Sequence, residues 1–145
     1  MVIKMTVSRR TSLLVIAVVA VLAVAAALYT PKLMNWDNDD GDYGDVSIQE
    51  AIEFIEEKPD LVIIDVRTVA EFEDGHIEGA INIPVDKLPD RLAELSKDDE
   101  LLVYCRTGNR SGAAVNILSD AGYMRIYHMH EGISVWIQQG HPVVQ

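Results

Sequence analysis

The sequence predicts an α/β fold in which helices cover both faces of a mostly parallel sheet. Two short apolar runs rich in branched side chains, Leu61–Asp65 (LVIID) and Leu101–Cys105 (LLVYC), have the length and composition of buried strands. Apolar residues at helical spacing follow them in 86–95 and 111–121. Strands that alternate with helices in this way favour parallel pairing.

The other elements of this domain, residues 46–145, follow from local signals. The capping box Ser47-Ile48-Gln49-Glu50 opens a first helix, which ends before Pro59. Further along, the pattern predicts helical turns at 68–73, a short strand at 80–84, a strand at 125–129 and a last helix at 133–139. In that last helix Trp136 is expected to face the core.

One hydrophobic helix is expected ahead of the domain. A basic segment, 1–12, precedes an uncharged apolar run, 13–29, which we interpret as a transmembrane anchor or the core of a signal peptide. Residues 30–45 form an acidic linker. Since Arg9 and Arg10 precede the run and aspartates follow it, the domain is expected outside the cytoplasm, either membrane-anchored or secreted and periplasmic after signal cleavage.

The charge of the chain excludes one large class of partner. Lys and Arg number 12 and Asp and Glu number 23. Residues 1–36 hold four of the bases and none of the acids, so residues 37–145 carry 23 acids against 8 bases. An excess of this size argues against nucleic acid as a partner, because its affinity comes largely from basic side chains on phosphate.

The chain contains one cysteine, Cys105, in the stretch YCRTGNRSG. It stands at the carboxyl end of a predicted buried strand, where ligands bind in open α/β sheets. The following residues, Arg106 to Arg110, form a short loop leading into a helix that Ser111 opens. Backbone N–H groups of such a loop and nearby arginines lower a thiol's pKa, so Cys105 is either a nucleophilic thiolate or an inert buried thiol, and the loop favours the thiolate.

Three stretches in order along 46–145 resemble the rhodanese family. They are IIDVRTVAEFEDGHIEGAINIP at 63–84, YCRTGNRSG at 104–112 and GISVWIQQGHPV at 132–143. The resemblance implies a rhodanese-like fold and a sulfurtransferase without a cofactor. In such an enzyme Cys105 takes a sulfur from a small donor such as thiosulfate, holds it as a persulfide and passes it to cyanide, a small thiol or a protein thiol.

The resemblance also implies roles for the neighbours of Cys105. Arg106, Thr107, Gly108, Asn109 and Arg110 line the substrate pocket, where Arg106 and Arg110 can hold an oxyanion. Thr107 stands where members that prefer thiosulfate often have a basic residue, which weakens the expectation of that donor. The C-terminal stretch also departs from the family pattern, since Glu131-Gly132 replaces two glycines.

The loop length separates two alternatives. Four residues lie between Cys105 and Arg110, whereas related phosphatases and arsenate reductases resemble this loop but have five. The shorter loop suits a single sulfur atom rather than a tetrahedral oxyanion. A phosphatase or arsenate reductase is thus the less favoured enzyme, and a non-catalytic rhodanese-like binding module is the other alternative.

Asp65, Arg67 and Ser111 are expected to support the loop. For Arg67 a structural role is the favoured interpretation, for instance an ion pair with Glu71, four residues on. His128 and His130 alternate on one strand, but no third ligand has a readable spacing, so no metal site is predicted. His76 is expected to make a structural hydrogen bond.

Overall fold

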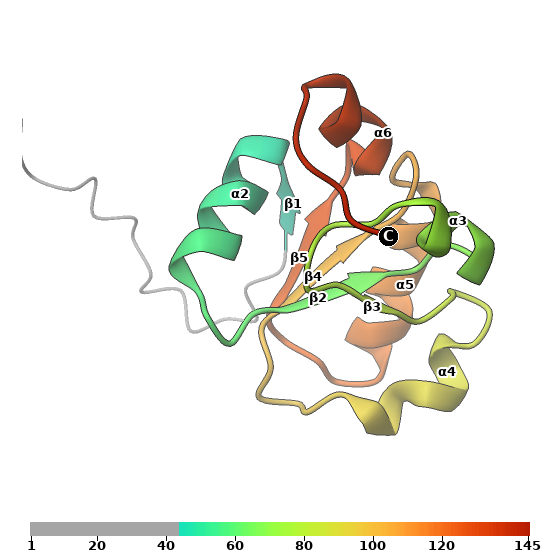
Figure 1. Cartoon of the computed structure of the whole chain (residues 1–145). Helices are drawn as coiled ribbons and strands as arrows, with labels where there is room; N and C mark the ends of the chain where they lie inside the picture. Colours follow the sequence, from blue (N-terminus) through green and yellow to red (C-terminus); the bar gives the residue numbers. More distant parts are fainter. Residues whose placement is uncertain (1–43) are drawn as a thin grey trace, which may run out of the picture. The chain divides into compact units, whose positions relative to one another are not determined.

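The computed structural model of the protein describes residues 44–145, which form a five-stranded parallel sheet (Figure 1). The strands lie in the order β1-β5-β4-β2-β3. All neighbouring strands are parallel. Their bounds are β1 Gly44–Val46, β2 Val62–Asp65, β3 Ile81–Asn82, β4 Leu101–Tyr104 and β5 Ile126–Met129. The parallel α/β fold predicted from the sequence is confirmed for this part of the chain.

Helices cover both faces of this sheet, as Figure 1 shows. One face packs against α2 and α6, and the other against α4, the 3-10 helix η1 and α5. Their bounds are α2 Ile48–Glu57, α4 Leu88–Arg91, η1 Leu92–Glu94, α5 Asn109–Asp120 and α6 Gly132–Gln138, and a sixth short helix, α3, spans Val69–Asp74.

Alternate residues of the central strand β4 belong to different cores. Leu102 and Tyr104 pack with the residues of α2 and α6, and Leu101 and Val103 pack with those of α4 and α5. All four are fully buried, which explains why β4 is apolar throughout. Cys105 continues the alternation and lies on the α5 side.

Local sequence signals set several helix boundaries correctly. Ser47 and Glu50 form the predicted capping box at the start of α2. Thr68 and Glu71 form a second capping box at the start of α3, where helical turns were expected. Trp136 is buried in the core on the α6 side, as predicted.

Three boundaries differ from the prediction. The strand expected over 80–84 is reduced to Ile81–Asn82, just ahead of Pro84, which has no N–H for a ladder. The helix expected over 86–95 divides into α4 and the 3-10 turn η1. The helix expected from Ser111 begins two residues earlier, so Asn109 and Arg110 belong to its first turn rather than to a loop.

The predicted hydrophobic segment, 13–29, and the basic segment before it lie outside the described residues. Within 44–145 no helix is both long and apolar enough to span a membrane. The last residues of the predicted linker, Gly44 and Asp45, belong to β1, where Asp45 pairs with His128 of β5.

The start of α6 is pressed against the loop that follows β4, here called the Cys105 loop (Cys105 to Gly108). The N–H of Ile133 donates to the carbonyl of Cys105 at 2.9 Å, and that of Ser134 to the carbonyl of Arg106 at 3.1 Å. Gly132 has a φ of 71°, and a Cβ there would stand 2.4 Å from the Arg106 carbonyl oxygen. Only glycine permits this approach.

We expect Gly132→Ala to lower the free energy of unfolding by about 2 to 4 kcal/mol, measured by denaturant titration. The matched control is Gly122→Ala, whose φ of 87° is similar but whose Cβ would meet nothing within 4 Å. The control is expected to lose only about 1 to 2 kcal/mol. Equal losses in the two variants would show that the Cys105 loop yields to the new methyl group at no cost.

Candidate active site

The sulfur of Cys105 lies just beyond β4, beneath its own loop. Cys105 is the first residue after the strand, and only 1 % of its surface is exposed. Its neighbours in the loop differ, since Arg106 and Thr107 are exposed and Gly108 is buried. The sulfur is therefore covered, while the two residues that follow it are open to solvent.

Four hydrogen-bond donors converge on this sulfur. The Ser111 hydroxyl lies 3.4 Å from Sγ, and backbone N–H groups of Thr107, Gly108 and Ser111 also donate to it. Burial raises the pKa of the Cys105 thiol, but these hydrogen bonds together outweigh burial and hold the pKa below its ordinary value. The site thus favours the thiolate, which is the nucleophilic form of cysteine.

The same contacts explain why α5 begins earlier than the sequence predicted. Gly108 takes a left-handed conformation, with φ of 91°, and has no side chain to cap the helix. A Cβ at this position would stand 2.1 Å from the carbonyl oxygen of His130. Because the Ser111 N–H of the first turn donates to Sγ, the cysteine sulfur occupies the place of a capping acceptor.

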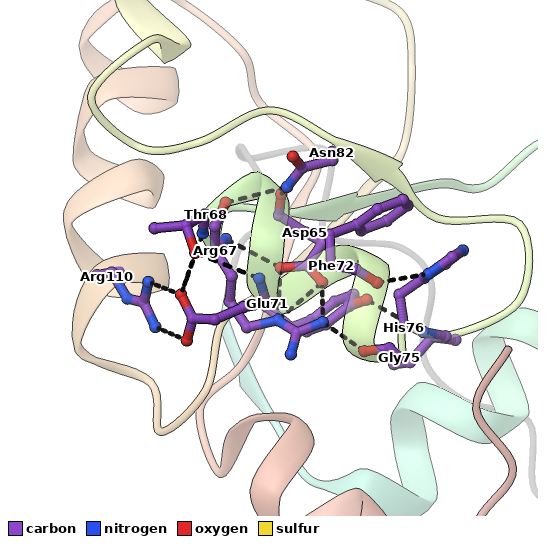
Figure 2. Close-up of polar contacts among 11 residues, drawn as sticks. Asp65, Arg67, Thr68, Glu71, Phe72, Gly75, His76, Asn82 and Arg110 are labelled. Carbon is purple, nitrogen blue, oxygen red and sulfur yellow. Dashed lines mark hydrogen bonds and ion pairs between the residues drawn. The ribbon is translucent and has the colours of Figure 1, made fainter. Parts of the chain in front are cut away.

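Arg110 does not point freely toward an incoming anion. Its guanidinium makes two hydrogen bonds to Glu71 at the start of α3, at 2.6 and 2.8 Å (Figure 2). The hydrogen bonds from Arg110 are the largest cause that lowers the pKa of Glu71 to about 2. An oxyanion bound by Arg110 would share it with Glu71, whereas Arg106 forms no ion pair with any residue in 44–145.

Arg67 forms a structural ion pair, the role favoured from the sequence, but its partner is not Glu71, the residue given there as an example. Arg67 instead forms an ion pair with Asp65, in which Nη2 lies 2.6 Å from Oδ2, and it donates a hydrogen bond to the Gly75 carbonyl at 2.7 Å (Figure 2). Asp65 is fully buried and Arg67 is 6 % exposed. A buried carboxylate requires a partner of this kind, so the Arg67 side chain points into the fold and supports the end of β2.

His76 and His130 have structural contacts. His76 places Nδ1 2.9 Å from the Phe72 carbonyl, as expected for a structural hydrogen bond. His130 places Nδ1 3.1 Å from the Val46 carbonyl. Among residues 44–145 no three side chains form a group that could hold a metal ion.

Nothing in the sequence indicated that Glu71 and His128 contact the residues around Cys105. Glu71 could be placed at the start of α3 by its capping-box spacing from Thr68, but Arg110 is 39 positions away. His128 lies 2.9 Å from the Ser111 hydroxyl. Such contacts between distant segments have no local sequence signal.

A cavity of about 200 Å³ adjoins the exposed side of the Cys105 loop. Its walls combine charged residues with apolar ones, among them Arg67, Arg106, Ile133, Ser134 and Ile137. The cavity has room for a small molecule beside Arg106 of the Cys105 loop.

Comparison with known proteins assigns this arrangement to a family. The profile of the family described as "Rhodanese-like domain" matches residues 47–139. The chain belongs to the rhodanese-like domain family. A rhodanese-related protein from Thermoplasma volcanium has the same fold, with a TM-score of 0.62 and 36 % identity over 70 % of this chain and 98 % of that one.

Two curated relatives indicate the range of proteins that contain such a domain. A protein named "Sulfurtransferase" from Allochromatium vinosum is 38 % identical over 85 residues, which cover 59 % of this chain and 79 % of the relative. The "HTH-type transcriptional regulator Rv0324" of Mycobacterium tuberculosis is 42 % identical over 89 residues, which cover 60 % of this chain. That match spans 39 % of the regulator, well under half its length.

We expect Glu71→Gln to lower the free energy of unfolding by about 0.5 kcal/mol at pH 7, because the partly exposed ion pair with Arg110 is lost. Gln is accepted at this capping-box position, so the helix cap remains. The pKa of Glu71 is lowered in the folded protein, so its contribution is present above pH 4.5 and is lost as the pH falls through about 2.

Denaturant titrations between pH 7 and pH 3 test this difference. Glu94→Gln, which removes the exposed pair with Arg91, is the matched control and is expected to lose less. If the drop in unfolding free energy caused by Glu71→Gln does not become smaller as the pH falls below 4.5, the charge of Glu71 is not its cause.

Proposed function

We propose that the protein is a sulfurtransferase that carries a sulfane sulfur on Cys105. The observation that supports this most directly is the convergence of the Ser111 hydroxyl and three backbone N–H groups on one buried sulfur. Fixed donors of this kind stabilise a charged sulfur without reorganising during the reaction. Membership of the rhodanese-like domain family and the relative named "Sulfurtransferase" support the same chemistry.

The proposed reaction has two displacements at sulfur. In the first, the Cys105 thiolate attacks the outer sulfur of a donor such as thiosulfate, a new S–S bond forms and the bond to the leaving group breaks, so that sulfite departs with its electron pair. In the second, cyanide or a thiolate attacks the terminal sulfur of the persulfide and the Cys105 thiolate leaves. Each step returns a sulfur anion to the same N–H groups.

Arg106 is the residue we propose to attract an anionic donor. It is exposed, it borders the cavity, and the domain around it is strongly acidic. Arg110 contributes less positive charge to the approach, because Glu71 already neutralises it. This arrangement suits a small donor of low charge better than a highly charged one.

The short loop supports sulfur transfer over phosphate hydrolysis. A phosphoryl group needs donors for three equatorial oxygens, whereas the donors of Thr107, Gly108 and Ser111 are already directed at Sγ. Gly108 also has no room to move outward, because it lies against the His130 carbonyl.

The nucleophile is tested by Cys105→Ser. The wild-type protein, reduced and then treated with thiosulfate or another sulfane donor, is expected to gain the mass of one sulfur atom, which cyanide removes as thiocyanate. The variant is expected to gain none and to transfer sulfur only at the uncatalysed background rate, because a hydroxyl is a far weaker nucleophile at neutral pH.

Mass spectrometry and thiocyanate release measure these outcomes, and circular dichroism verifies the fold of the variant. Hydrolysis of an aryl phosphate by the wild type, without any persulfide, would favour the phosphatase or arsenate reductase alternative. A wild-type protein that neither loads sulfur nor hydrolyses phosphate would instead be a binding module.

We also propose that residues 13–29 anchor the protein in a membrane with its domain outside the cytoplasm. The apolar run and the preceding Arg9 and Arg10 support this orientation. Removal of the segment by a signal peptidase would leave the domain on the same side.

Cell fractionation tests the anchor. The full chain is expected with the membranes, and a truncated chain that starts just before β1 in the soluble fraction. Protease added from outside the cytoplasmic membrane is expected to cleave the domain. Protection of the domain would contradict the orientation, and a soluble product that lacks its N-terminus would show signal cleavage.

A further inference from the structure

A line of polar side chains connects the first strand to the sulfur of Cys105. Asp45 of β1 places Oδ1 2.7 Å from Nδ1 of His128. Nε2 of the same imidazole lies 2.9 Å from Oγ of Ser111, and that hydroxyl lies 3.4 Å from Sγ. The line passes from a strand through a neighbouring strand to a helix, so the fold rather than local sequence brings it together.

The Ser111 hydroxyl has one proton and three neighbouring acceptors. They are Sγ of Cys105, the Gly108 carbonyl at 3.0 Å and, when it carries no hydrogen, Nε2 of His128. The hydroxyl can donate to one of them at a time. Whether it serves the sulfur therefore depends on what the imidazole does.

The contacts of the imidazole indicate where its hydrogens lie. The Asp45 carboxylate only accepts, so Nδ1 carries a hydrogen that it donates to Oδ1. Nε2 lies 3.2 Å from the Gly108 carbonyl as well as beside Ser111, and two bare acceptors at that distance would repel each other. With hydrogens on both ring nitrogens, Nε2 would donate toward the Ser111 oxygen and the Gly108 carbonyl, whereas a bare Nε2 would accept the hydroxyl hydrogen of Ser111.

We propose that His128, held by Asp45, is a positioning residue that turns the Ser111 hydroxyl onto the sulfur of Cys105. When Nε2 donates a hydrogen, it cannot accept one from Ser111, and it also competes with Ser111 for the Gly108 carbonyl. The Ser111 hydroxyl then donates its hydrogen to the thiolate of Cys105. The proposal deepens the sulfurtransferase function, on which its importance for catalysis depends, by adding a control on the nucleophile.

The surroundings of His128 identify the groups that matter for its effect. Asp45 faces it from β1, and Ser111 and Gly112 from α5, where a Cβ at Gly112 would stand 3.7 Å from the ring. The ring of His130, which follows the last residue of β5, lies 6.5 Å away. The His128 side chain is 13 % exposed but that of Asp45 is 69 % exposed, so solvent and salt weaken the contribution of Asp45 more.

Two amide variants of His128 test the hydrogen bonds of its two ring nitrogens separately. In His128→Asn the shorter side chain can still donate to Asp45 from the position of Nδ1 but cannot reach Ser111. In His128→Gln the longer side chain places its amide near the position of Nε2 and can still donate to the Ser111 oxygen. The measurement is the rate of Cys105 alkylation by iodoacetamide in the full chain as a function of pH, which reports the thiolate directly.

We expect His128→Asn to raise the midpoint of this pH profile by about 0.5 to 1 pH unit, because the thiolate loses the donated hydroxyl. His128→Gln is expected to retain at least half of the wild-type effect. Asp45→Asn is expected to raise the midpoint less, by an amount that added salt reduces. The rate at high pH, where every molecule is ionised, is expected to stay the same in all of them.

The matched control is His130→Asn, which changes an exposed histidine just after the same strand. The His130 ring is hydrogen-bonded to the Val46 carbonyl rather than to Ser111. Its midpoint is expected to equal that of the wild type. A double-mutant cycle then asks whether His128 acts through Ser111: in a Ser111→Ala background, His128→Asn is expected to cause no further shift.

Three results would overturn the proposal. They are an unchanged midpoint in His128→Asn, an equal shift in His130→Asn, and a shift in His128→Asn that persists in full without the Ser111 hydroxyl. Because alkylation needs no sulfur donor, these results are independent of sulfur loading. A protein that shows the expected shifts but never forms a persulfide would refute the proposed function and leave the positioning role intact.

Discussion

A buried thiolate is stable only while the N–H groups around it stay in place, and the packing of α6 on the Cys105 loop keeps them there. Ile133 and Ser134 donate to the carbonyls of Cys105 and Arg106. The Arg106 carbonyl belongs to the peptide unit whose N–H, that of Thr107, donates to the sulfur. Gly108 is fixed from the same side by the His130 carbonyl. The hydrogen bonds can then outweigh the burial that would otherwise protonate the thiol.

Charge around the site is arranged in pairs rather than as a broad positive surface. Asp65 neutralises Arg67 inside the fold, and Glu71 neutralises Arg110 beside the loop. Arg106 is left as an exposed cation that lines the cavity beside the Cys105 loop. In a domain with such an excess of acids, one such cation has a local effect that falls away within a Debye length of about 8 Å at physiological salt. The attraction of an anion to this part of the surface therefore depends on contact at short range more than on long-range attraction.

The sequence was informative where local pattern decides the structure. Apolar runs located β2 and β4, and the position of Cys105 after β4 followed from them. The start of α5 was missed because a sulfur atom, rather than a serine or aspartate, caps it. The partners of Arg110 and His128 lie 39 and 83 positions away, so only the folded sheet brings them together. For Arg67 the sequence offered Glu71, four residues on, as an example of a partner. The actual partner, Asp65, is a buried carboxylate at the end of β2, and spacing along a helix does not reveal such a contact.

The close approach of Gly132 to the Arg106 carbonyl constrains how such a site can diversify in evolution. An inserted or deleted residue between Cys105 and Gly108 would displace the carbonyls that Ile133 and Ser134 hold, and helix α6 would have to shift with them. Loop length and helix position are therefore inherited together. Point changes at exposed positions such as Arg106 and Thr107 carry no such coupling, so the side chains there can change one residue at a time while the sulfur keeps its surroundings.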